Sequence, residues 1–104
     1  MIKRRQIMPL TNPQRSYLRG LTHSLHPIVM IAENGVSEAI QKELDIALNA
    51  HELVKVRISA PDRETKTLWL GELIGASKSE LIQQIGHIAT LYRKAKEPKL
   101  MLPK

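Results

Sequence analysis

Few residues of this 104-residue chain have the types and spacing that chemistry at a site requires. His23 and His26 lie close together, but no carboxylate accompanies them, so solvated or capping histidines are favoured over a metal site. Asp62 and Glu64 have basic neighbours, which favours a charged helix start over an acid–base pair. Cysteine is absent, and the five glycines form neither a Walker-type loop nor a dinucleotide-binding fingerprint. We therefore expect a protein that is not an enzyme, has no cofactor and takes no small-molecule substrate.

The turn Ala32–Glu33–Asn34–Gly35 is the one local feature with binding chemistry. Asparagine and glycine tolerate positive φ, so the turn can bring backbone N–H groups, with a helix N-terminus behind them, against a phosphate. The alternative is that these four residues form an ordinary strand-to-helix turn that binds nothing. Taken alone, the four residues favour this alternative.

Basic residues concentrate at the two ends of the chain. The net charge is +6, and the pI is about 9.9. Residues 1–19 hold five basic and no acidic residues, and residues 93–104 hold five basic residues and one acidic residue, which leaves a net charge of −3 between them. Such ends favour a polyanionic partner, although basic tails that only maintain solubility are the alternative. A start of translation at Met8 would make the first basic cluster dispensable.

Apolar spacing predicts the elements that position these residues. Asn12 and Pro13 form a cap and first-turn pair for a helix that Pro27 stops. Its apolar stripe is expected to be Tyr17, Leu18, Leu21 and Leu25. The opposite, solvent-facing side is expected to carry Arg15, Arg19, Thr22 or His23, and His26.

The remaining pattern alternates strands and helices. Residues 28–31 are wholly apolar and predict a strand covered on both sides, and a helix follows from Ser37 to about residue 50. Residues 53–59 alternate as a strand whose outer face carries Lys55 and Arg57. A third helix begins at residues 61–62 and ends at a left-handed cap on Gly75. Residues 81–85 and 88–92 form a hairpin whose Gly86–His87 turn suits type II′.

The predicted order is therefore α-β-α-β-α-β-β, in a single domain with a mixed sheet. No apolar run approaches the roughly 20 residues that a membrane span needs. We expect a soluble cytoplasmic monomer that does not bind membranes.

Several short motifs of the chain resemble those of the CRM domain family, named for chloroplast RNA splicing and ribosome maturation. The motifs are Leu18–Arg19–Gly20–Leu21 with His23, Pro27–Ile28–Val29, Asn34–Gly35–Val36, His51–Glu52–Leu53–Val54–Lys55–Val56, Asp62–Arg63–Glu64–Thr65–Lys66, Ile85–Gly86–His87 and Leu91–Tyr92–Arg93. The resemblance extends from Leu10 onward and is greatest to the bacterial stand-alone form. It implies an α/β two-layer fold similar to the C-terminal domain of translation initiation factor three, with a four-stranded sheet in the order 1-2-4-3. The expected organisation is a basic arm at 1–9, the domain at 10–94 and a basic tail at 95–104.

The resemblance also implies an RNA-binding function, with ribosomal RNA in precursors of the large ribosomal subunit as partner. The turn at residues 32–35 corresponds to the family's GxxG loop, which is compared with the phosphate-binding loop of KH domains. Ala32 replaces the first glycine of that loop, and Glu33 adds a negative charge. The predicted RNA-binding residues are Arg15, Arg19, His23, Glu33, Asn34, Gly35, Lys55, Arg57, Arg63, Lys66, Arg93 and Lys94.

Two other classes of function remain to be weighed. A protein-binding adaptor would dock on a ribosomal protein or translation factor through the exposed sheet face or the second helix, and its basic ends would be incidental. A small hydrolase would need polar groups clustered in a pocket, and the sequence offers none. The aromatic content of 3% argues that phosphate contact, rather than base stacking, dominates any RNA binding.

Overall fold

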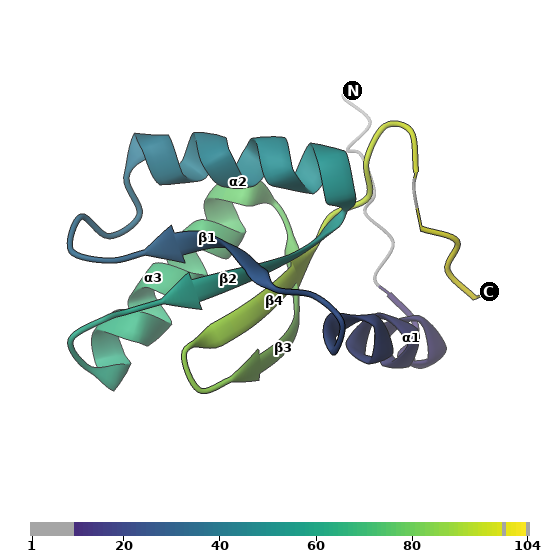
Figure 1. Cartoon of the computed structure of the whole chain (residues 1–104), viewed down its shortest axis with the longest axis horizontal. Coiled ribbons are helices and arrows are strands. Elements are labelled where there is room, and N and C mark those ends of the chain that lie inside the picture. The colour runs from purple at the N-terminus through teal and green to yellow at the C-terminus, as the bar shows by residue number, and fades with distance from the viewer. Residues whose placement is uncertain (1–9, 99, 104) are drawn as a thin grey trace, which may run out of the picture.

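A computed structural model describes residues 10–98 and 100–103, so the expected basic arm at 1–9 lies outside the described residues, as do Lys99 and Lys104 of the expected tail. The helices and strands follow the predicted order (Figure 1). They are α1 (Asn12–Thr22), β1 (Pro27–Ile31), α2 (Glu38–His51), β2 (Leu53–Ile58), α3 (Arg63–Ser77), β3 (Glu80–Ile85) and β4 (Ile88–Tyr92). The sheet order is β1-β2-β4-β3, with β1 and β2 parallel and the other pairs antiparallel, which confirms the predicted mixed sheet.

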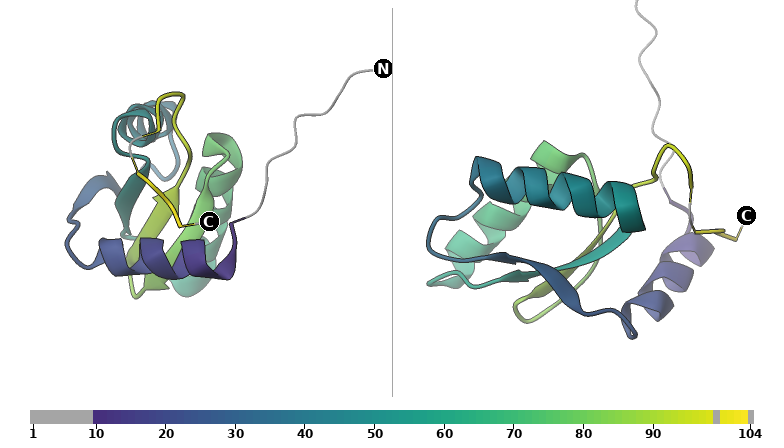
Figure 2. Two further views of the ribbon diagram at one scale, coloured as in Figure 1. Left: turned by 90° about the vertical axis from the view of Figure 1, so that its right-hand side faces the viewer. Right: turned by 45° about the horizontal axis from the view of Figure 1, so that its top comes forward.

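Helices α2 and α3 cover one face of the sheet, and α1 packs on the opposite face at one end (Figure 2). The main core lies between the sheet and α2 and α3, where the inward residues of period-two strands meet the apolar stripes of the helices. Its buried members are Val29, Ile31, Leu44, Ala47, Leu48, Val54, Val56, Ile58, Leu70, Leu73, Ala89 and Leu91. A smaller cluster of Leu18, Leu53, Ile82 and Tyr92 fixes α1 to the sheet.

Strand β1 is covered on one side only, and the prediction of cover on both sides is wrong. Val29 and Ile31 are fully buried, whereas Ile28 and Met30 are 49% and 60% exposed. The reason is that α1 covers only one end of its face and leaves the rest of the sheet open. An apolar run cannot by itself distinguish a strand buried on both faces from an edge strand buried on one.

Helix α1 is shorter than predicted and begins from a different cap. Thr11, not Asn12, is the N-cap: its Oγ1 accepts a hydrogen bond from the Gln14 N–H at 3.2 Å, and the Gln14 side chain accepts one from the Thr11 N–H at 2.9 Å. This reciprocal pair is a capping box. The helix ends at Thr22 rather than at Pro27, and Tyr17, expected on the buried stripe, is 40% exposed.

The end of α3 also differs from the prediction, while the hairpin matches it. Gly75 lies inside the helix, and Lys78 takes the left-handed cap conformation with φ 55°. The helix therefore continues past the glycine to Ser77, whose hydroxyl donates to the Leu73 carbonyl at 2.7 Å. In the β3–β4 turn Gly86 has φ 60° and His87 does not have positive φ, which is the pattern of a type II′ turn.

The C-terminal segment packs against the domain, and Glu52 holds it there. Glu52 is fully buried and has φ 64°. Its carboxylate accepts hydrogen bonds from the Ala95 N–H at 2.8 Å and the Leu100 N–H at 2.7 Å. Leu100 and Leu102 then pack on the small cluster beside α1. The described residues of the expected tail therefore pack against the domain that precedes them in the chain. No helix in the described ranges is long and apolar enough to cross a membrane.

Candidate nucleic-acid interface

The loop at residues 32–35 is a tight turn, and one of the backbone amides predicted to bind RNA is hydrogen-bonded within it. The Gly35 N–H donates to the Ala32 carbonyl at 2.8 Å, and Gly35 is buried with φ 62°. That amide is therefore not available to a phosphate, which corrects the expectation for Gly35. Glu33 and Asn34 occupy the exposed centre of the turn, and Asn34 does not have positive φ.

The loop leads directly into the N-terminus of α2. The Ser37 N–H donates to the Gly35 carbonyl at 3.0 Å, and the Ser37 Oγ caps the helix by accepting from the Ile40 N–H at 3.2 Å. Within the described residues no acceptor is found for the N–H groups of Glu38 and Ala39, which are exposed in the first turn. These two amides, and not that of Gly35, are the loop-side donors that an anion can reach.

Three connections meet at the end of the sheet opposite α1: the 32–37 loop, the β2–α3 connection and the β3–β4 hairpin (Figure 1). Backbone hydrogen bonds join them, from the Ser59 N–H to the Ile31 carbonyl at 2.8 Å and from the Ile58 N–H to the His87 carbonyl at 2.7 Å. Lys66 adds a contact from its Nζ to the Gly86 carbonyl at 3.1 Å. This end is called the loop end below.

The loop end carries both signs of charge. Arg63 is exposed at the start of α3, and Lys66 follows one turn later. Asp62 caps the same helix by accepting from the Thr65 N–H at 2.7 Å, and this hydrogen bond holds the pKa of Asp62 below its usual value. The loop end is therefore not a uniformly basic surface. An anion would bind at the loop end where a cationic side chain extends farther into solvent than the neighbouring carboxylates.

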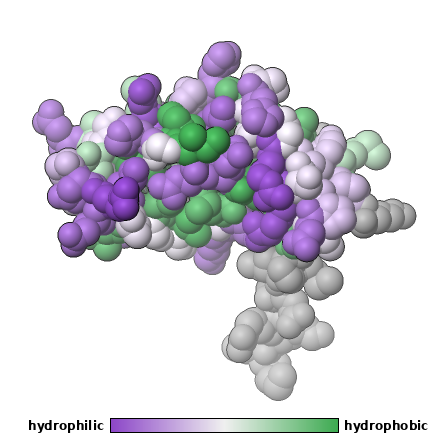
Figure 3. Space-filling model, turned by 90° about the horizontal axis from the view of Figure 1, so that it is seen from below, coloured by the Kyte–Doolittle hydropathy of each residue, from purple (hydrophilic) through white to green (hydrophobic). Residues whose placement is uncertain are grey.

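The part of the sheet face opposite α2 and α3 that α1 leaves uncovered, called the open face below, is more uniformly basic. Strand pairing places two rows of residues on it: Met30, Arg57, Ile88 and Ile85 in one row, and Lys55, Thr90 and Gln83 in the next. Their only charged members are Arg57 and Lys55. Between the open face and the end of α1 lies a hollow of about 200 Å³ lined by Thr22, His23, Lys55, Gln83, Ile85, Ile88 and Thr90. Figure 3 shows apolar and hydrophilic side chains interleaved over the underside of the molecule.

The two cations on β2 differ in their surroundings. Arg57 is exposed, and Lys55 donates to the Leu25 carbonyl at 3.1 Å. A carbonyl does not neutralise the ammonium group, so the charge of Lys55 still acts on the open face. In the described part of the chain neither residue has a carboxylate partner. The basic outer face expected for this strand is thus confirmed.

Arg15 does not lie free on the solvent side of α1. Its guanidinium pairs with Glu80 at 2.5 Å and donates to the Leu81 carbonyl at 3.3 Å, and the two side chains are each about one-third exposed. Thr22, an alternative for the same side, is buried and donates to the Arg19 carbonyl. These findings correct the predicted basic stripe, because the charge of Arg15 is offset within the protein. Arg19 and His23 are exposed, as expected.

Arg93 likewise has a structural role. Its guanidinium pairs with Asp45 at 2.8 Å and donates to the Ser77 carbonyl at 2.9 Å and to the Asn49 Oδ1 at 3.0 Å. It thereby connects α2, the end of α3 and the residue after β4. Lys94 is exposed. Arg15 and Arg93 were both predicted to bind RNA, and both are found in ion pairs. Arg93 makes more hydrogen bonds within the protein than Arg15 does.

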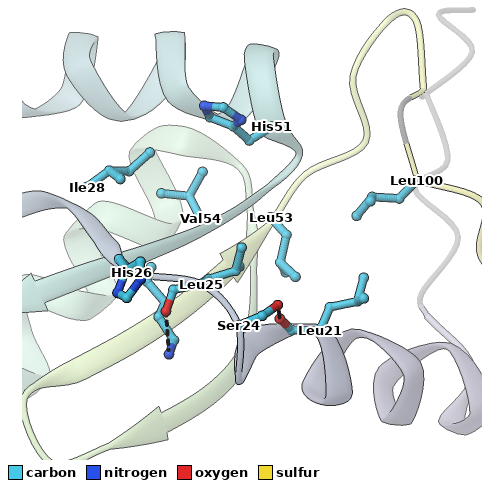
Figure 4. A pocket seen from close by; sticks show the side chains of 10 residues that line it. Leu21, Ser24, Leu25, His26, Ile28, His51, Leu53, Val54 and Leu100 are labelled. Atoms are coloured by element: carbon cyan, nitrogen blue, oxygen red, sulfur yellow. Dashed lines mark hydrogen bonds between the residues drawn. The ribbon is translucent and has the colours of Figure 1, made fainter.

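A larger hollow, of about 410 Å³, was not foreseen from the sequence (Figure 4). It lies among the end of α1, the start of β1, the end of α2 and the C-terminal segment. Its lining residues are Leu21, Ser24, Leu25, His26, Ile28, His51, Leu53, Val54, Lys55 and Leu100. Most are apolar, and they come from segments distant in sequence, so no local motif reveals them. No three His, Cys, Asp or Glu side chains gather as a metal site among the residues with described positions.

Comparison with known proteins gives consistent results over nearly the whole chain. The family model described as CRS1 / YhbY (CRM) domain matches residues 10–93. An RNA-binding protein of Haemophilus influenzae is 43% identical over 95 residues, which cover 91% of this chain and 96% of the relative. A probable RNA-binding protein of Bacillus subtilis is 37% identical, over 86% of this chain and 94% of the relative.

A solved structure shares the fold as well. The solution structure of a Staphylococcus aureus protein, proposed to bind RNA, matches with a TM-score of 0.77 at 38% identity. The match covers 91% of this chain and 100% of that one. The similarity therefore extends over nearly the whole chain and is not limited to a single motif.

Proposed function

The chain belongs to the CRS1 / YhbY (CRM) domain family, and we propose on this basis that it binds RNA, namely ribosomal RNA in precursors of the large ribosomal subunit during ribosome assembly. The observation that carries the proposal is that relatives matching nearly the whole chain are named RNA-binding proteins. The open face supports it, because its charged residues are both cations and have no carboxylate partners in the described structure. The protein would act in the cytoplasm as a monomeric binding protein and not as an enzyme.

RNA would lie across the open face toward the loop end. Arg57 and Lys55 would contact phosphates from the sheet, and Arg63 and Lys66 from α3. Arg19 and His23 would extend the surface onto α1, and Lys94 would add a contact beyond β4. Because the chain has few aromatic residues, phosphate contacts and RNA shape would supply more affinity than base stacking.

The 32–35 loop would contribute through the exposed N–H groups of Glu38 and Ala39 and the side chain of Asn34. Glu33, exposed in the same turn, would oppose this contact by repelling phosphate. The loop would therefore bind more weakly than a loop with a neutral or basic residue at this position. The cations of the open face would carry the larger share of the affinity.

A protein-binding adaptor is a second candidate, because two large apolar residues are exposed on the open face. Met30 is 60% and Ile85 is 64% exposed, and both lie in the row that includes Arg57. Exposed apolar side chains in one row suit a protein partner better than a phosphate backbone. An adaptor of this kind would bind a ribosomal protein without salt-sensitive affinity for naked RNA.

Binding to deproteinised ribosomal RNA separates the two candidates. We expect salt-sensitive binding that Arg57→Glu weakens by roughly tenfold, since the change removes one attraction and adds one repulsion. Lys42→Glu is the matched control, because Lys42 is exposed on α2, away from the open face. Equal effects of the two variants would refute the proposed surface. Crosslinking in cells, followed by mapping of the crosslinked RNA, tests whether that RNA belongs to the large subunit.

A further inference from the structure

The indole of Trp69 lies directly against the 32–35 loop. A Cβ atom added to Gly35 would be 3.1 Å from both Cε2 and Nε1 of Trp69 and 3.3 Å from its Cζ2. All three of the nearest atoms belong to this one side chain. Gly35 therefore lacks a side chain for two reasons: its positive φ, and the close approach of the indole.

Trp69 is itself held firmly by the fold. It is partly buried and packs against the main core, next to Leu70, which is buried in α3. The helix is fixed at its start by the Asp62 cap. The position of the indole is thus set by α3 and the core, and the loop rests on a rigid support.

The contact connects two parts of the proposed RNA surface. On one side are the turn with Asn34 and the start of α2, which the hydrogen bond from the Ser37 N–H to Gly35 joins together. On the other side, Lys66 lies one turn before Trp69 in α3 and reaches the hairpin through the Gly86 carbonyl. Without the indole, the hydrogen bonds of the turn itself would remain, but the loop would lose its contact with α3 and would be ordered in part when RNA binds.

We propose that Trp69 is a positioning residue that holds the 32–35 loop in the conformation that contacts RNA. The inference rests on the proposed RNA-binding function and adds a specific role for a residue that does not itself contact phosphate. Ordering the backbone of one freed residue costs a factor of roughly five to thirty in affinity. Because the loop contributes less affinity than the open face, we expect Trp69→Leu to weaken RNA binding by about fivefold, the lower end of that range, measured where the variant is still fully folded.

Leu68→Ala is the matched control, because Leu68 is the adjacent residue of α3 and is 62% exposed. RNA affinity is measured by fluorescence anisotropy of a labelled ribosomal RNA fragment, with folding checked by circular dichroism. Hydrogen exchange of the Gly35 amide, which donates to the Ala32 carbonyl, reports the order of the loop and does not depend on the ring current of the indole. We expect this exchange to accelerate in Trp69→Leu and to be unchanged in Leu68→Ala. If Trp69→Leu does not fold, the same measurements are made on Trp69→Phe, which keeps a smaller aromatic side chain at this position.

Three results would overturn the positioning role while RNA binding by the unmodified protein stands. The first is unchanged affinity in the Trp69 variant. The second is an equal loss in Leu68→Ala. The third is lost affinity with unchanged hydrogen exchange of the Gly35 amide, which would mean that the indole contacts RNA itself. If the unmodified protein shows no salt-sensitive RNA binding, the proposed function fails first. That result is distinct from the other three.

Discussion

Among the described residues, Glu52 and Lys78 are the residues other than glycine that have positive φ, and replacing each with glycine should have opposite effects on stability. A residue in such a conformation costs about 1–3 kcal/mol, which glycine relieves. Glycine also gains about 0.4–1 kcal/mol of conformational freedom in the unfolded chain, which offsets part of the relief. At Lys78, which is exposed at the end of α3, only these two effects apply. We therefore expect Lys78→Gly to stabilise the fold by about 1 kcal/mol.

At Glu52 the same change removes a buried carboxylate. The N–H groups of Ala95 and Leu100 lose their acceptor, and an unsatisfied buried donor costs about 1–3 kcal/mol. A cavity would also form where the fully buried side chain lay. The loss exceeds the backbone relief, so Glu52→Gly should destabilise the fold by about 2–4 kcal/mol.

Thermal unfolding followed by circular dichroism measures both effects. For a domain of this size 1 kcal/mol corresponds to about 4–8 °C in Tm, so Glu52→Gly should lower Tm by at least about 8 °C while Lys78→Gly raises it. Hydrogen exchange of the Ala95 and Leu100 amides should accelerate selectively in Glu52→Gly. Stabilisation by both glycine variants would refute the role of the carboxylate in holding the C-terminal segment.

Three further predictions follow from the surface charges and from one buried phenol. Arg19→Glu should weaken RNA binding and leave Tm unchanged, whereas Arg15→Glu should lower stability by about 1 kcal/mol, because it places two like charges together at Glu80. Unfolding curves and RNA titrations of both variants check this, and identical behaviour would contradict it. Glu33→Lys should tighten RNA binding by several-fold and steepen its salt dependence, and an unchanged affinity would exclude the loop as a contact surface. Burial, aided by nearby carboxylates, raises the pKa of Tyr92 above its usual value of 10.0, so the folded state favours the neutral phenol. The contribution of Tyr92 to stability is fully present below about pH 10 and is lost as the pH rises through the folded-state pKa. Urea unfolding should show this loss for the unmodified protein and not for Tyr92→Phe.

The order of elements and the sheet could be predicted because apolar periodicity and turn residues are local signals. The alternation at residues 53–59 identified β2, and Gly86 identified the hairpin. Helix ends were less predictable, since several residues near each end can act as caps. Thr11, rather than Asn12, is the N-cap because the Gln14 side chain completes a capping box with it.

The candidate site was less predictable, because an arginine is the same residue in sequence whether it faces RNA or a carboxylate. Arg15 pairs with Glu80, and Arg93 with Asp45, and both partners are distant along the chain. Only the fold brings them together. The role of Glu52 had no local signal either, since glutamate in a positive-φ conformation is rare and its hydrogen-bond donors come from the C-terminal segment.

The salt dependence of RNA affinity tests the proposed function most directly. With Arg15 and Arg93 occupied in ion pairs, six exposed or partly exposed cations without carboxylate partners in the described structure are taken as the phosphate contacts: Arg19, Lys55, Arg57, Arg63, Lys66 and Lys94. Each phosphate neutralised on single-stranded RNA contributes about −0.7 to the slope of log affinity against log salt. A slope near −4.2 for a ribosomal RNA fragment is therefore predicted, to within about one contact. Affinity that does not change with salt would contradict the proposal that this protein holds RNA through its basic surface.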